Sequence, residues 1–163
     1  MHKPGIVLIV MSLAIVVLLG CNRGANKNGE KRPVIGASML SLQSEFVVNV
    51  KDAMEAHAKE KNVELIVNDA QRTADKQVQQ IETFISQKVD AIILNPCEVE
   101  ASSPAVEKAK AAGIPIINVN SETAATPDGF VGSRDEDAGE IAMEQIAKLL
   151  QGKGNIVIIE GYM

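Results

Sequence analysis

The side chains best suited to chemistry in this sequence are polar groups, nearly all of them neutral, that follow short apolar runs. The strand-end residues with such groups are Ser41, Gln43, Ser44, Asn68, Asp69, Gln71, Asn95, Asn120 and Ser121. One aromatic residue, Phe46, opens the first predicted helix. Amides and hydroxyls can pair with the hydroxyls of a polyhydroxylated ligand, and an aromatic ring can stack on the apolar face of a sugar. The same polar residues are also common in turns and helix caps. The residues alone therefore leave both interpretations open.

Residue types that catalyse reactions are sparse. His57 falls on a helical pattern facing Ala and Met, which is typical of a half-buried structural histidine. Cys97 has no base close to it in the sequence. The spacings of a metal site are absent, and no G-x-G-x-x-G follows the first apolar run. The sequence thus predicts a non-enzymatic protein with no catalytic residue, no metal and no cofactor.

The composition narrows the possible partners. The chain has 163 residues, a net charge of −5, one Tyr, three Phe and no Trp. A nucleic-acid surface needs clustered Lys and Arg or stacking aromatic residues, so nucleic acid is excluded as a partner. Apolar residues make up 46% of the chain, which is enough for a real core.

Short apolar runs alternate with helical patterns along the chain. Strands are predicted at 34–39, 63–67, 91–94, 114–119, 130–131 and 155–159, and helices at 46–61, 75–88, 103–112 and 136–150. This order predicts an α/β fold built from right-handed βαβ units around a doubly wound parallel sheet. Such sheets bind ligands beyond the carboxyl ends of their strands, which is where the polar residues lie.

The first 20 residues have the pattern of an export signal. Residues 6–19 carry no charge, but 14 residues are short of the ~20 needed to span a bilayer. Leu18-Leu19-Gly20-Cys21 then resembles a bacterial lipoprotein signal, which implies cleavage before Cys21 and lipidation of its thiol. The alternative is a short transmembrane anchor or an uncleaved signal, with Cys21 incidental. Residues 22–33 are polar and rich in Gly and Asn, which predicts a flexible tether.

Several motifs after the tether together resemble one family. They are SEFVVNVKDAM, VNDAQ, QVQQIETFI, VDAIILNP, AGIPIINVN and FVGSRDEDAG. In these motifs the chain is similar to the sugar-binding proteins of ABC importers, in the subgroup of ribose-, galactose- and inositol-binding proteins. The resemblance runs over residues 34–163.

The resemblance implies a periplasmic-binding-protein fold of type I, with two lobes that close on a monosaccharide or polyol. It also implies an ABC permease as partner. Together with the lipoprotein signal around Cys21, it implies a place at the cell membrane, lipid-anchored on the extracytoplasmic side. The expected divisions are a signal peptide at 1–20, the lipidated cysteine and tether at 21–33, the first lobe at 34–131, and the hinge crossing with the start of a second lobe at 132–163. The remainder of that lobe is expected beyond residue 163.

The family's site residues carry over in part. Phe46 occupies the position of a family aromatic residue that packs on the sugar, and Asn95 that of an Asn that bonds a hydroxyl. Asn120 stands where the family often has Asp, Ser121 where ribose binders have Arg, and Ser44 in place of Asn or Asp. Losing Asp and Arg removes charge-assisted hydrogen bonds, so the resemblance points away from ribose and toward a hexose, an inositol or a relative.

A second function is compatible with the same fold. A binding protein of this type can hand its liganded state to a chemoreceptor or a kinase instead of a permease. A transcriptional regulator of the same fold needs a basic helix-turn-helix in front, where this chain has a leader. The sequence leaves transport and sensing open.

Lipidation of Cys21 gives the first testable prediction. Cells that express the chain and are grown with radioactive palmitate are expected to label it, because the thiol carries the diacylglycerol. The Cys21→Ala variant is expected to lose the label. Equal label in both proteins would contradict the anchor.

Overall fold

The computed structural model describes residues 31–159. The signal segment, Cys21 and nearly all of the tether lie outside the described residues, so their predictions stay predictions. By their contacts, the described residues from Arg32 onward belong to one unit. Within the described residues no helix is both long and apolar enough to cross a membrane.

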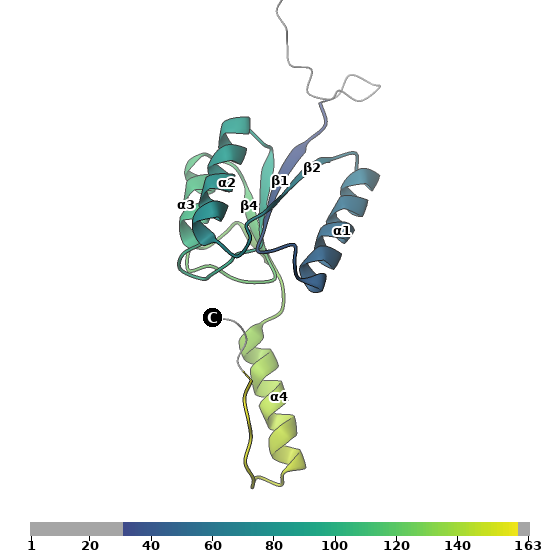
Figure 1. The fold of residues 1–163 in the computed structure, drawn as a ribbon, viewed down its shortest axis with the longest axis vertical. Coiled ribbons are helices and arrows are strands. Elements are labelled where there is room, and N and C mark those ends of the chain that lie inside the picture. Colours follow the sequence, from purple (N-terminus) through teal and green to yellow (C-terminus); the bar gives the residue numbers. More distant parts are fainter. Residues whose placement is uncertain (1–30, 160–163) are drawn as a thin grey trace, which may run out of the picture. The chain divides into compact units, whose positions relative to one another are not determined.

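A five-stranded sheet forms the centre of the described chain (Figure 1). Its strands are β1 (Val34–Met39), β2 (Glu64–Asp69), β3 (Ala91–Leu94), β4 (Ile116–Val119) and β5 (Gly129–Val131). All neighbours pair in parallel, in the order β2-β1-β3-β4-β5. β1 is therefore an interior strand between β2 and β3, and both of these partners come later in the chain. The predicted parallel sheet is confirmed.

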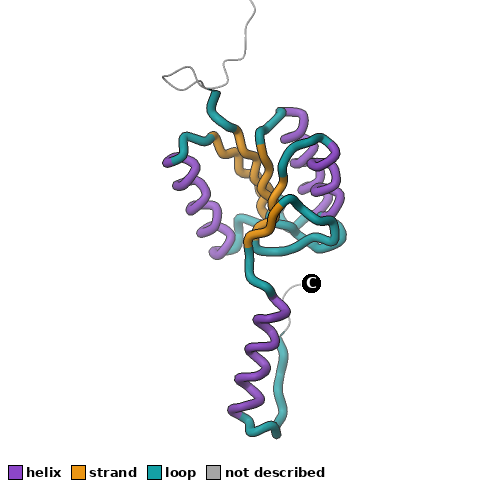
Figure 2. The backbone as a smooth tube through the Cα atoms, turned by 180° about the vertical axis from the view of Figure 1, so that it is seen from behind, coloured by secondary structure: helices purple, strands orange, loops and turns teal. Residues whose placement is uncertain are grey.

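Helices cover both faces of the sheet. They are α1 (Glu45–Glu60), α2 (Ala74–Gln87) and α3 (Ser103–Ala111), and a further helix, α4 (Asp135–Leu149), follows the last strand. Figures 1 and 2 show α1 on one side of the sheet and α2 with α3 on the other. This two-sided cover confirms the doubly wound α/β class.

Most element ends fall within two residues of the predicted ones. β4 begins at Ile116 instead of residue 114, because Pro115 has no N–H to donate to a neighbouring strand. The predicted strand at 155–159 is wrong: these residues have no regular structure, and Val157 and Ile159 are 89% and 92% exposed. A strand needs a paired neighbour, and none of the described strands pairs with this segment.

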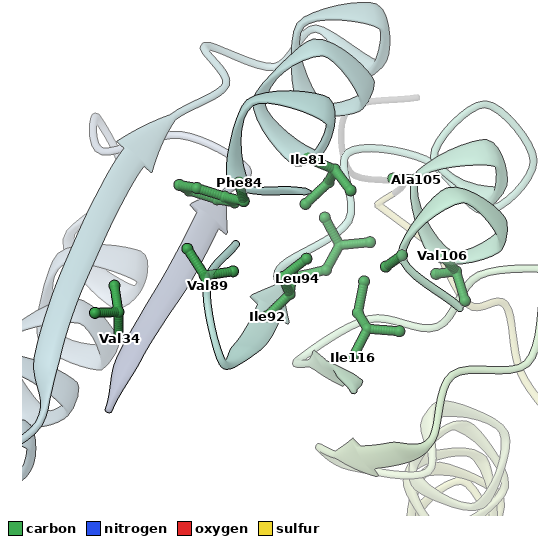
Figure 3. Close-up of a cluster of buried hydrophobic side chains, with 10 residues drawn as sticks. Val34, Ile81, Phe84, Val89, Ile92, Leu94, Ala105, Val106 and Ile116 are labelled. Atoms are coloured by element: carbon green, nitrogen blue, oxygen red, sulfur yellow. The ribbon is translucent and has the colours of Figure 1, made fainter. Parts of the chain in front are cut away.

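The main core lies between the sheet and the α2–α3 layer (Figure 3). Ile81 and Phe84 of α2 meet Ile92 and Leu94 of β3, and Val106 and Ile116 complete the cluster. These side chains are fully or almost fully buried. A smaller cluster of Ala37, Met39 and Val47 lies on the α1 side. Phe84 lies so close to β1 that a Cβ at Gly36 would stand 2.6 Å from its ring.

This close approach predicts that Gly36→Ala lowers the free energy of unfolding by about 1–3 kcal/mol, because the added methyl overpacks the core. Urea unfolding followed by circular dichroism measures the change. Gly139→Ala in α4 is the matched control, because nothing lies within 4 Å of the new methyl and Ala favours a helix. A Gly36→Ala protein as stable as the Gly139→Ala protein would refute the steric argument.

Candidate ligand-binding site

The carboxyl ends of all five strands meet at one edge of the sheet, because every strand runs in the same direction. The loops that leave this edge, the lower one in Figure 1, begin after Met39, Asp69, Leu94, Val119 and Val131. Four of the five predicted ligand residues lie in or just after these loops, and Phe46 follows at the start of α1. The fold thus places the predicted residues on one edge, as the sequence indicated.

Asn95 joins three of the strand ends. Its Oδ1 accepts a hydrogen bond from Leu40 N (3.3 Å), just beyond β1, and its Nδ2 donates to Val119 O (3.1 Å), at the end of β4. Its own N–H donates to Ser38 O (2.9 Å). The residue is 1% exposed. Asn95 was predicted to contact a ligand. The structure buries its side chain just inside the carboxyl edge, where it holds the loops together.

Asp69 ties the loop after β1 to the loop after β2. Its Oδ1 accepts hydrogen bonds from Leu42 N (3.3 Å) and Gln71 N (2.8 Å). Gln71 and Arg72 have left-handed backbones, with φ of 55° and 60°, which turns the chain sharply into α2. Gln80 of α2 donates to Asp69 O (2.9 Å), and this hydrogen bond fixes the turn to the helix.

Asn120 and Ser121 form a tight turn after β4. Asn120 has a φ of +69°, a conformation that Asn tolerates better than most residues. Its N–H donates to Val131 O (2.8 Å), and its Nδ2 donates to Ser121 Oγ (3.3 Å). Both residues are partly exposed at the edge. Their polar groups are therefore available to a ligand that lies against the loops.

Ser44 and Phe46 stand at the start of α1. Ser44 is the N-cap residue, and its carbonyl accepts the first helical bond from Val48 N (3.0 Å), while its hydroxyl makes no capping bond. Phe46 is 56% exposed, although it is a large apolar side chain. An exposed ring beside polar loops is suited to stacking on a sugar.

A cavity of about 680 Å³ opens between α1 and the uncovered part of the sheet. Phe46 and Asn120 both line it, whereas Ser44, Asn95 and Ser121 do not. Most of its walls are apolar, from α1 residues such as Val50 and Met54. The polar carboxyl edge and this apolar cavity are therefore different surfaces, which adjoin at Phe46 and Asn120.

The structure reveals two site-supporting residues that the sequence reasoning missed. Gln77 and Ser102 are fully buried and hydrogen-bonded to the loop after β3. A signal was present in the sequence, because Gln77 precedes Ile81 and Phe84 by four and seven residues and so shares their apolar helix face. A polar residue at a core position needs partners.

The described residues hold no group of three or more His, Cys, Asp and Glu that could bind a metal. Cys97 follows Pro96 in the loop after β3, and its Sγ lies 3.9 Å from Leu40 O. Burial, followed by the negative charges of Glu98 and Asp69, raises the pKa of this thiol from 9.0 to about 11. A thiol that stays protonated at neutral pH is a poor nucleophile.

Comparisons with known proteins show the family of the chain. A model described as periplasmic binding protein domain matches residues 35–163. The chain is 37% identical over 146 residues to a xylitol-binding protein of Mycolicibacterium smegmatis, covering 88% of this chain and 41% of that protein.

Two solved structures are similar as well. One is an ABC transporter solute-binding protein from Bacillus halodurans with bound myo-inositol (39% identity, TM-score 0.69, 74% of this chain and 42% of that one). The other is the fructose-binding periplasmic domain of a hybrid two-component system (26% identity, TM-score 0.71, 76% and 41%).

The chain therefore belongs to the periplasmic binding proteins, and it is similar to sugar- and polyol-binding members of ABC importers. The predicted family, the α/β type I fold and the non-enzymatic class are confirmed. The chain spans less than half the length of the relatives just named.

The raised pKa of Cys97 predicts slow alkylation at pH 8. Two pKa units lower the thiolate fraction about 100-fold relative to the unfolded chain. Iodoacetamide labelling of the Cys21→Ser variant, read by mass spectrometry, is expected to be about 100-fold slower in buffer than in urea, and to speed up toward pH 11. Equal rates at pH 8 would contradict the assignment.

Proposed function

We propose that this protein is an extracytoplasmic, lipid-anchored solute-binding protein of an ABC importer, and that its ligand is a monosaccharide or polyol. The observation that carries the proposal is the carboxyl edge of the sheet, where loops cross-linked by Asn95 present partly exposed polar groups beside an exposed aromatic ring. Membership of the periplasmic binding proteins supports the same conclusion.

The chemistry of the predicted site residues favours a neutral ligand. The side chains offered to solvent by the predicted site are the hydroxyls of Ser44 and Ser121, the amide of Asn120 and the ring of Phe46. Each hydroxyl and amide can donate and accept, as sugar hydroxyls do, and none of them carries a charge. The relatives named for xylitol and crystallised with myo-inositol are consistent with a polyol.

Binding is proposed to occur by closure of two lobes over the ligand. Residues 34–131 form the first lobe, and residues 132–163 cross the hinge and begin the second. This division is supported by α4, which carries apolar side chains such as Ile141 and Leu149 and buries none of its residues. A helix of that kind needs a layer to pack on. The coverage of 41% of the xylitol-binding relative agrees with one lobe and the start of another.

The lipid anchor and the permease complete the proposal. The anchor rests on the sequence around Cys21, and the permease rests on the importer relatives. A tethered binding protein stays close to its membrane partner, which raises its effective concentration there.

A sensor is the second candidate function. The similarity to the fructose-binding domain of a hybrid two-component system favours it specifically. Deleting the gene and measuring uptake of the bound sugar separates the two functions. Lost uptake is expected for the importer, and unchanged uptake would point to the sensor.

Calorimetry tests the ligand class directly. The full-length protein with both proposed lobes is titrated with myo-inositol, xylitol, D-allose and D-ribose, and heat is expected from at least one neutral polyol or hexose, with ribose weaker. Phe46→Ala is expected to weaken the best ligand about tenfold, because stacking on an aromatic ring contributes roughly 1–2 kcal/mol. Lys59→Ala, exposed on the same helix, is the control with unchanged affinity. The absence of heat with every polyol would reject the proposed function.

A further inference from the structure

The helix α2 carries a primary amide where its neighbours are apolar. Gln77 is fully buried, and it lies one and two helical turns before the core residues Ile81 and Phe84. A buried amide without partners costs free energy, so a residue of this type in a core position needs specific contacts. All side-chain hydrogen bonds of Gln77 go to the loop after β3, at the carboxyl edge of the sheet, which we call the ligand edge.

Gln77 holds the loop after β3 from the side of the core. Its Nε2 donates to Asn95 O (2.7 Å), and its Oε1 accepts from Cys97 N (2.9 Å) and from Ser102 Oγ (2.9 Å). Ser102 Oγ in turn accepts from Cys97 N (3.1 Å) and Glu98 N (3.2 Å). Two buried side chains thus clamp the backbone on both sides of Pro96.

The clamp reaches the other loops through Asn95. With its backbone fixed by Gln77, Asn95 directs its amide to Leu40 N and Val119 O. Leu40 begins the loop that leads to Ser44 and Phe46, and Val119 directly precedes Asn120. A hydrogen-bonded path therefore runs from α2 to both loops that carry the predicted ligand contacts.

We propose that Gln77 is a positioning residue for ligand binding, which acts through Asn95 to set the spacing of the loops after β1, β3 and β4. It touches no ligand itself. The inference rests on the proposed function for its effect on affinity, but the path of hydrogen bonds is a property of the lobe alone.

The affinity test uses Gln77→Met, which keeps the length of the side chain and removes its hydrogen bonds. The full chain is titrated with myo-inositol, or with the polyol of the panel that the unsubstituted protein binds best. The Kd is expected to rise about tenfold, because loops free to shift must be ordered again on binding. Ile81→Val, on the same helix and in the core, is expected to stay within about twofold while it lowers stability.

The Asn95→Ala variant separates a positioning role of Gln77 from a general loss of structure. In the Asn95→Ala protein the path is already cut, so Gln77→Met is expected to weaken binding no further. If the two losses of affinity add, Gln77 does not act through Asn95 and the proposal is overturned.

Hydrogen exchange followed by NMR tests the path without a ligand. Gln77→Met is expected to speed exchange at the Leu40 amide, whose acceptor is the Asn95 side chain, and Ile81→Val is expected not to. An unchanged Leu40 amide in the Gln77→Met protein overturns the proposal, even if Asn95→Ala fails to fold. If the unsubstituted chain binds no polyol, the proposed function fails, while faster Leu40 exchange still supports the path.

Discussion

Parallel strands that end at one edge leave peptide groups beyond the sheet's last paired residues, and these groups need partners. Here the side-chain amide of Asn95 satisfies Leu40 N and Val119 O at once, from a position between them in the sheet. The loops after β1, β3 and β4 thereby hold a fixed spacing without the help of charge. The proposed site at this edge depends on this one buried amide, because Asn120 stands on one of the loops that it joins and Phe46 on the helix that follows another.

The two faces of the sheet are stabilised in different ways. Beneath α2 and α3 the side chains interdigitate so closely that β1 has room only for hydrogen at Gly36. Beside α1 the same strands line a largely apolar cavity. The main core lies on the α2–α3 face, next to the clamp formed by Gln77 and Ser102, so the carboxyl edge is anchored to this core. Burial of apolar side chains stabilises the fold there, and the hydrogen bonds of the buried amides fix the arrangement of the loops.

Periodicity predicted the helices and most strands, because apolar spacing is set by contacts within one element and the layer beneath it. It failed at residues 155–159, where an apolar run has no paired strand among the described residues. The position of the ligand edge was predictable from the βαβ order alone. The orientation of Asn95 was not, because an amide after a strand can face a ligand or cap a neighbouring loop, and its partners are 24 and 55 residues away. Gln77 was missed for the same reason, since its partners also come from a distant loop.

The interior position of β1 has a consequence for the synthesis of the chain and for its proposed export. β1 is the first of the described strands to be synthesised, yet Ile35 pairs with Leu65 on one side and Ala91 on the other. Its hydrogen bonds on the β3 side and its close contact with Phe84 therefore cannot form until β3 and α2 exist. Contacts of such sequence separation form slowly. A nascent chain of this topology therefore remains incompletely folded during much of its synthesis. That delay suits the proposed export, in which the polypeptide crosses a membrane before it folds.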